Sequence, residues 1–202
     1  MMKKIIVIFS ICLLFAGGIN AQDIKLPAPQ TTGGMPLMEA LSKRQTTRTF
    51  SNRDVDRQTL SNLLWSANGF NRPDRRTAPT ARDRQELELY VALSTGLYWY
   101  DAKAHTLVQK SKKDIRALTG QQDFVGVAPV NIVIVGDTKK QDVEKYYYLD
   151  CGYVSQNIYL FCASAGLITV ARGLFDAPAL SKALELPRTH AIVLTQTVGY
   201  SK

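Results

Sequence analysis

The chain has 202 residues, with 25 Lys and Arg against 17 Asp and Glu, and 46% of its residues are hydrophobic. This length fits one domain with a sizeable core, and the composition excludes a disordered or repetitive chain. Two histidines and three cysteines, without a CxxC or HExxH pattern, argue against a multi-ligand metal centre. Without Walker A, GxGxxG or GxSxG motifs, the chain also lacks the usual signs of phosphate-loop, Rossmann and serine-hydrolase proteins.

The first 21 residues have the pattern of a Sec-type signal peptide. Lys3 and Lys4 precede an apolar stretch of 15 residues, 5–19, which is followed by Asn20-Ala21-Gln22. A membrane span needs about 20 apolar residues, so a cleaved signal is favoured over an uncleaved anchor, which stays the alternative. Removal of residues 1–21 leaves 23 Lys and Arg, a net charge of +6, and predicts a periplasmic or extracellular protein without stable membrane insertion.

The rest of the chain predicts one α+β domain over residues 36–202, after a flexible Pro- and Gly-containing leader over 22–35. Apolar spacing predicts helices over 36–43, 56–68, 140–165 and 177–184. It predicts strands over 87–93, 97–100, 105–109, 130–135, 168–171 and 191–195. Because these helices and strands mix without strict alternation, we expect a single sheet flanked by helices.

Two features inside this pattern carry further expectations. The polar stretch 69–84 holds five arginines, and an irregular segment of that length is usually functional. Cys151 and Cys162 lie in one predicted helix, about 16 Å apart along its axis. A disulfide needs Cα atoms within about 7 Å, so we expect two buried free thiols.

Residues 44–48, Arg-Gln-Thr-Thr-Arg, form the first candidate binding motif. The β-branched Thr46-Thr47 pair favours extended backbone, in which Arg44, Thr46 and Arg48 lie on one side. Two guanidinium groups and a hydroxyl suit a phosphate dianion. In a helix the two arginines still share a face but Thr46 points away, and a solvated basic patch is the remaining interpretation.

Residues 78–85, Ala-Pro-Thr-Ala-Arg-Asp-Arg-Gln, form the second candidate motif. Pro79 fixes the backbone, and the small residues Thr80 and Ala81 allow a planar ring to approach the main chain. Asp83 and Gln85 can then hydrogen-bond the edge of that ring. A proline-containing turn without a ligand is the alternative.

Three weaker features complete the candidates. Gly152 costs a helix about 1 kcal/mol relative to Ala, which indicates either close approach of another group or simple helix packing. Ala171, Arg172 and Gly173 follow a predicted strand and can present backbone to a second side of the same ligand. Lys202 places an ammonium group at the chain end, either for a phosphate or as part of an exposed tail.

In their order and spacing, these motifs resemble the nitroreductase family of flavoproteins, and within it the compact SagB-type dehydrogenases. The stretches that carry the resemblance are SKRQTTRTF (42–50), APTARDRQELELYVA (78–92), LDCGYVSQNIYLFCASAGL (149–167), TVARGLFD (169–176) and QTVGYSK (196–202). The first two are similar to the family's Arg-x-Ser/Thr-x-Arg and Pro-Ser/Thr-Ala-x-Asn-x-Gln patterns. The resemblance implies a mixed sheet flanked by helices, in an intertwined homodimer with two FMN sites at the subunit interface.

By that resemblance, the first motif and the chain end hold the FMN phosphate and ribityl chain. Arg44, Thr46 and Arg48 match family positions with that role, and Lys202 falls near a basic position at the phosphate. Gln45 stands where the family often has a basic residue, which removes one phosphate contact.

The resemblance places the second motif beside the isoalloxazine ring. Pro79, Thr80 and Gln85 match positions there, with Ala81 between them in the predicted site. Residues 171–173 (Ala171, Arg172 and Gly173) match a stretch on the ring's other side, which the family often supplies across the dimer. Asp83 stands where the family usually has Asn, so a carboxylate replaces an amide donor and is expected to lower the flavin potential.

The resulting prediction is an FMN-dependent oxidoreductase in which flavin N5 carries the chemistry and no side chain is catalytic. The family's ping-pong scheme implies that a donor such as NAD(P)H delivers hydride. An acceptor, such as a nitroaromatic, a quinone or another small conjugated molecule, then takes the electrons. The alternatives are an exported flavin-binding protein without turnover and a basic polyanion-binding module. The latter is weak because the arginine-rich loop lacks interleaved aromatic residues, and no nucleic-acid partner is expected.

Overall fold

The fold was analysed in a computed structural model that describes residues 22–202, so the predicted signal peptide lies outside the described residues. The helices are α1 (Leu37–Lys43), α2 (Arg57–Asn68), α3 (Glu144–Ala165) and α4 (Ala177–Ala183). Short 3₁₀ turns are η1 (Ala81–Asp83), η2 (Arg116–Thr119) and η3 (Asp123–Gly126). Among the described residues no helix is both long and apolar enough to span a membrane.

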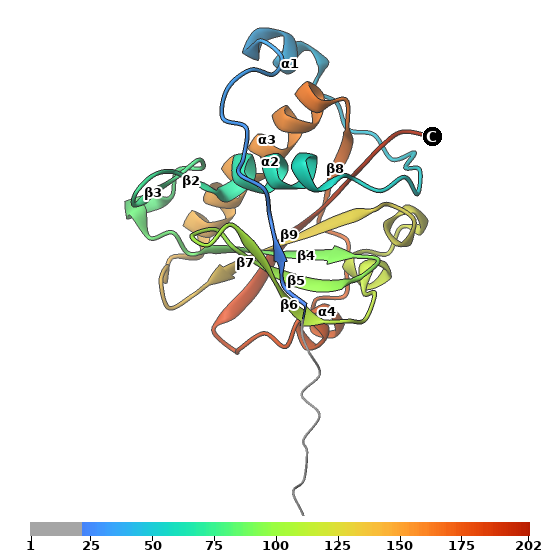
Figure 1. The fold of residues 1–202 in the computed structure, drawn as a ribbon. Helices are drawn as coiled ribbons and strands as arrows, with labels where there is room; N and C mark the ends of the chain where they lie inside the picture. Colours follow the sequence, from blue (N-terminus) through green and yellow to red (C-terminus); the bar gives the residue numbers. More distant parts are fainter. Residues whose placement is uncertain (1–21) are drawn as a thin grey trace, which may run out of the picture.

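A seven-stranded sheet in the order β1-β6-β5-β4-β7-β9-β8 forms the centre of the domain (Figure 1). Its strands are β1 (Ile24–Lys25), β4 (Leu87–Leu93), β5 (Gly96–Asp101), β6 (Thr106–Ser111), β7 (Val130–Asp137), β8 (Ile168–Arg172) and β9 (His190–Gly199). A separate hairpin pairs β2 (Phe70–Arg72) with β3 (Arg75–Arg76). The α+β prediction is confirmed. All pairs in the described sheet are antiparallel, however, so within this chain the sheet is not mixed.

Helices cover both faces of the sheet, α2 and α3 on one side and α4 on the other (Figure 1). Side chains alternate between the two faces along a strand. In β4, Leu89 and Val91 therefore join the core beneath α2 and α3, while Tyr90 and Ala92 pack toward α4. Strand β7 is buried along its whole length, as its continuous apolar sequence predicted.

The segment 22–35, expected to be a flexible leader, is instead held along the domain. Ile24 and Lys25 pair with β6 as an edge strand, and Leu26 is buried in the main core. The Met35 amide donates to Ser164 Oγ at 2.8 Å. A two-residue strand and one buried leucine are too short to register as a periodic pattern, so composition alone favoured a linker.

A chain of partly buried hydrogen bonds fixes part of this segment. Tyr100 and His105 Nδ1 lie 2.9 Å apart, His105 Nε2 lies 2.7 Å from Ser61 Oγ, and Ser61 donates to Pro27 O at 2.6 Å. Because the Ser61 hydroxyl donates its hydrogen to the Pro27 carbonyl, it accepts from His105 Nε2. His105 then carries its hydrogen on Nε2, and its Nδ1 accepts from the Tyr100 hydroxyl. Burial lowers the pKa of His105, which keeps the ring neutral for this arrangement.

Helix α3 begins four residues later than predicted, because residues 138–140 form a turn after Asp137 and residues 141–143 are irregular. The Asp137 carboxylate accepts from the Lys139 amide at 2.9 Å, and its carbonyl accepts from the amides of Lys140 and Gln141. The helix ends at Gly166, whose φ of 68° is the left-handed conformation that favours glycine. Cys151 and Cys162 are buried free thiols, as predicted.

Candidate functional site

The Tyr159 hydroxyl joins the first candidate motif to β8. Helix α1 ends at Lys43, and the chain continues in extended form until the Thr47 amide donates to Thr169 O at 3.1 Å. Thr46 Oγ1 lies 3.0 Å from the Tyr159 hydroxyl of α3, which also accepts from the Ala171 amide at 3.0 Å. The non-helical interpretation of residues 44–48 is therefore the one that the backbone follows.

A cleft of about 490 Å³ opens beside this junction. Arg44 lines it, with its guanidinium carbon 5.4 Å from the centre of the Tyr159 ring. The side chains and backbone that line it come from α1, the 44–47 segment, α3 and β8: Ser42, Lys43, Arg44, Gln45, Thr47, Tyr159, Cys162, Ala163, Gly166, Leu167, Ile168 and Thr169. Among the described residues, the lining holds two cations and no carboxylate, but Lys43 Nζ is paired with Glu39 Oε1 at 2.6 Å. Arg44 is therefore the lining cation that favours an anion.

The C-terminus lies against the same segment. The Lys202 amide donates to Thr49 O at 3.1 Å, and Phe50 forms a bridge with Ser201. Lys202 thereby lies beside Thr49, the residue that follows Arg48. The side chains of Arg48 and Lys202 are both exposed. The structure thus brings Arg44, Thr46, Arg48 and Lys202 to one end of the domain.

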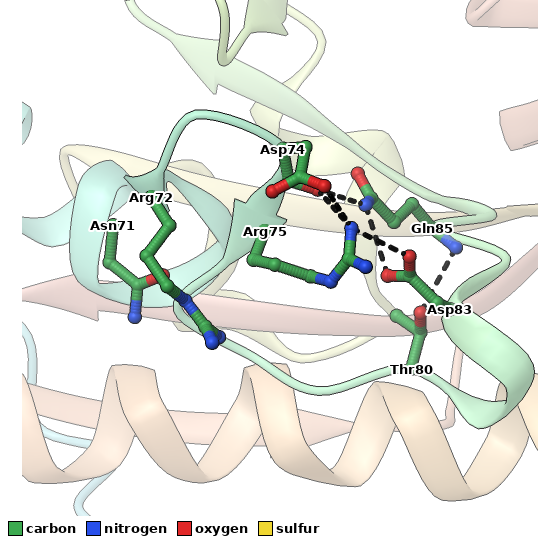
Figure 2. A network of polar contacts seen from close by, with 7 residues as sticks. All are labelled: Asn71, Arg72, Asp74, Arg75, Thr80, Asp83 and Gln85. Atoms are coloured by element: carbon green, nitrogen blue, oxygen red, sulfur yellow. Dashed lines mark hydrogen bonds and ion pairs between the residues drawn. The ribbon is translucent and has the colours of Figure 1, made fainter.

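The second motif folds into a tight loop beside the β2–β3 hairpin (Figure 2). Thr80 Oγ1 accepts from the Gln85 amide at 3.0 Å, and the Ala81 amide donates to Asp150 Oδ2 of α3 at 2.8 Å. Arg82, Asp83 and Gln85 have φ values of 56°, 54° and 50°. Left-handed backbone costs a non-glycine residue about 1 kcal/mol or more, so these contacts hold a strained shape.

The polar side chains of this loop bind one another. Asp83 Oδ2 lies 3.0 Å from Arg75 Nη1, and Asp83 Oδ1 accepts from Gln85 Nε2 at 3.1 Å (Figure 2). Gln85 Nε2 also donates to Asp74 O at 2.7 Å. Within this chain, Asp83 and Gln85 are thus occupied by neighbours, and a small hollow of about 200 Å³ lies beside Pro79 and Thr80.

Two of the five arginines of the 69–84 stretch, Arg75 and Arg76, are engaged by neighbouring groups. Besides its contact with Asp83, Arg75 binds Asp74, while Arg76 donates to Asn68 O at 2.9 Å and stacks on Phe70. A solvated polyanion-binding patch needs arginines that are available to phosphates. These contacts remove Arg75 and Arg76 from such a patch, while Arg72, Arg82 and Arg84 are exposed.

Arg172 points into the interior. It is 4% exposed, and its guanidinium donates to Thr119 O at 2.8 Å and to Asn131 Oδ1 at 3.1 Å. Burial lowers the pKa of Arg172 to about 10. The side chain thus anchors the end of β8 and is not presented to the cleft, whereas the Ala171 amide faces Tyr159 and a Cβ on Gly173 would meet open space.

The two candidate binding motifs, residues 44–48 and 78–85, contact different halves of α3. The loop reaches the helix at Asp150 and the 44–48 segment reaches it at Tyr159, nine residues or about 14 Å along the axis. Tyr159 and Asp150 lie in the stretch 149–167 that carries the resemblance, but the sequence assigned neither a role, because a helical tyrosine or a buried helical aspartate has no local signature. For Gly152 the sequence left close approach and helix packing open, and a Cβ there would meet open space among the described residues of this chain.

Comparison with known proteins assigns the fold. Residues 41–200 match the family described as the Nitroreductase family. The chain belongs to the nitroreductase family. A solved structure from Ralstonia eutropha, assigned as a nitroreductase, is 39% identical with a TM-score of 0.85 over 92% of each chain. A protein of Methanocaldococcus jannaschii, also assigned as a nitroreductase, is 27% identical over 77% of this chain and 86% of that one.

As a member of the nitroreductase family, the protein is an oxidoreductase. A structure from Clostridium difficile described as an FMN-dependent nitroreductase has a TM-score of 0.61, with 82% of this chain and 87% of that chain covered. At 20% identity this likeness shows a shared fold. The resemblance seen in the sequence motifs is thus confirmed at the level of family and fold.

Proposed function

We propose that the protein is an FMN-dependent oxidoreductase that passes electrons from a soluble donor to a small conjugated acceptor. The observation that carries the proposal is the cationic cleft at Arg44, where Thr46, Tyr159 and Ala171 share hydrogen bonds. Its family membership supports the same chemistry. The 20%-identical structural neighbour described as FMN-dependent supplies the cofactor class.

The residues present suit FMN at the phosphate end. A phosphate dianion needs cationic or N–H donors, and Arg44 supplies one in the cleft lining, whereas Lys43 is shared with Glu39 at 2.6 Å. Arg48 and Lys202 lie exposed at the same end of the domain and can add charge. In the proposed complex Arg44 and Arg48 hold the phosphate, and Thr46 donates to or accepts from the ribityl chain.

In the proposed mechanism, the side chains and backbone of this protein bind and orient the flavin, and no side chain transfers a proton. Bound FMN supplies reversible hydride acceptance and donation at its ring. The 79–85 loop offers small residues and backbone to one side of the ring, while 171–173 offers backbone to the other. Asp83 is paired with Arg75 at 3.0 Å, and this cation partly cancels the electrostatic effect of the Asp83 carboxylate on the ring. The predicted lowering of the flavin potential is correspondingly smaller than for a free carboxylate.

NAD(P)H is the proposed donor, and a nitroaromatic or quinone the proposed acceptor. A structure from Parabacteroides distasonis, described as an NADH dehydrogenase or NAD(P)H nitroreductase, shares the fold with a TM-score of 0.60. The predicted export belongs to the same proposal. Because Sec substrates cross the membrane unfolded, the flavin would be captured after export, and another reductant is an alternative donor there.

We further propose that two copies complete the site as a homodimer. In one chain the two ligand motifs meet different halves of α3, and this helix exposes Tyr148, Leu149 and Tyr153 around Gly152. An exposed apolar helix face is a typical subunit interface, and Gly152 would allow a second backbone to approach it. In sedimentation velocity, residues 22–202 should run at twice the monomer mass, and Gly152→Leu should shift the distribution toward monomer. A wild-type monomer at micromolar concentration would contradict the dimer.

A flavin titration tests the proposed function directly. Purified residues 22–202 should bind FMN in equimolar amount and turn yellow, and anaerobic NAD(P)H should bleach the flavin absorbance. Addition of a nitroaromatic or quinone should restore it, observed by absorbance spectroscopy under argon. A protein whose bound FMN is reduced by dithionite but by no biological donor would be a flavin carrier, and a protein that stays colourless would overturn the proposal.

A further inference from the structure

Two buried carboxyl groups lie directly beneath the 79–85 loop. Glu86, the residue that follows the loop, is 0% exposed, and Asp150 of α3 is 1% exposed. Asp150 Oδ2 accepts from the Ala81 amide at 2.8 Å, whereas neither carboxyl oxygen of Glu86 accepts a hydrogen bond from any of residues 22–202. Asp150 therefore meets the loop at Ala81, and burial and hydrogen bonding with Asp150 are among the causes that raise the pKa of Glu86.

A single proton held between Glu86 and Asp150 explains how both carboxyl groups can be buried. Two carboxylates cannot both stay charged in a buried contact, and an unpaired buried charge is costly. A protonated Glu86 instead donates to the Asp150 carboxyl, whose Oδ2 continues to accept from the Ala81 amide. Burial first, and then the neighbouring Asp150, raise the pKa of Glu86 to about 7, while Lys140 in the turn before α3 acts to lower it.

The loop depends on this anchor because its backbone is strained. Three of its residues, Arg82, Asp83 and Gln85, have positive φ, and such conformations persist only where the surroundings fix them. The ion pair between Asp83 and Arg75 is solvent-exposed, and exposed pairs contribute little. The Ala81–Asp150 hydrogen bond is the contact that ties the loop to a buried acceptor on a long helix.

We propose that Glu86 is a positioning residue for the flavin: by holding the proton shared with Asp150, it keeps the 79–85 loop in its ring-binding shape. This inference rests on the proposed FMN site. When the shared proton is lost, two buried negative charges face each other at the base of the loop. The pair separates, the Ala81 anchor weakens, and the ring loses its preformed backbone surface.

FMN affinity as a function of pH tests this role. Dissociation constants are measured by quenching of flavin fluorescence between pH 6 and pH 8.5 for the wild type and Glu86→Gln. Gln donates to Asp150 as protonated Glu does but cannot ionise. The ratio of wild-type to Glu86→Gln dissociation constants should rise about tenfold across this range, as expected for a group that titrates near pH 7. Titration of the FMN phosphate affects both proteins and cancels in the ratio.

Two further measurements make the outcome decisive. Glu144→Gln, which removes one exposed carboxylate at the start of α3, should keep the wild-type pH dependence. In flavin-free protein, amide exchange over residues 79–85, corrected for its intrinsic pH dependence, should accelerate at high pH in the wild type but not in Glu86→Gln. A constant affinity ratio with equal exchange in both proteins would overturn the inference. If no protein binds FMN at any pH, the proposed function fails, while the exchange data still decide whether Glu86 holds the loop.

Discussion

Replacement of both Arg44 and Arg48 by Ala is expected to weaken FMN binding by about 10²- to 10⁴-fold. Hydrogen bonds between charged groups contribute about 1.5–3 kcal/mol each, and about 1.4 kcal/mol corresponds to tenfold in affinity. Two guanidinium contacts to one phosphate therefore account for this range. Isothermal titration of the flavin-free protein measures the loss, and an unchanged dissociation constant would mean that the phosphate lies elsewhere.

Riboflavin provides an internal control for this prediction, because it has the same ring and ribityl chain but no phosphate. The wild type should prefer FMN strongly, whereas Arg44→Ala with Arg48→Ala should bind the two flavins about equally. Replacement of exposed Arg57 and Arg188 removes the same two charges away from the cleft and should preserve the preference. A variant that loses both flavins alike would indicate damage to the fold rather than loss of a phosphate contact.

The elements that the sequence predicted well are those whose signal is local. The apolar run at 130–135 became a strand buried on both faces, and Gly166 ends α3 in the left-handed conformation. The helix predicted over 56–68 is α2, with Asp56 as its cap through the Thr59 amide at 2.9 Å. In each case neighbouring residues carry the physical cause, so a short window of sequence contains enough information.

The features that escaped prediction depend on partners far away in the chain. The segment 22–35 is held by β6, and Thr46 finds Tyr159 across 113 residues. The direction of the Arg172 side chain is set by Thr119 and Asn131, although its position in the motif predicted a place beside the flavin. Spacing identifies which residues share a motif, but long-range packing decides which way each side chain points.

The same long-range packing around Arg172 gives the second large expected effect. Gly120→Ala should lower the free energy of unfolding by about 3–5 kcal/mol, because a methyl group at this position would overlap the Arg172 guanidinium. The guanidinium is 4% exposed and bonded to Thr119 and Asn131. It has no route to solvent, and breaking its hydrogen bonds leaves a buried cation unpaired. For a domain of this size the melting temperature should fall by about 10 °C.

Gly126→Ala is the matched control for this substitution. It lies in the neighbouring 3₁₀ turn, where a Cβ would stand 3.7 Å from Ala117 Cβ, an ordinary van der Waals contact. Its effect should stay within about 1 kcal/mol, as measured by thermal and urea unfolding of both variants. Equal stability of the two would contradict the buried position of Arg172. A selective loss in Gly120→Ala would instead establish that this cation holds the end of β8, and with it residues 171–173, against the rest of the sheet.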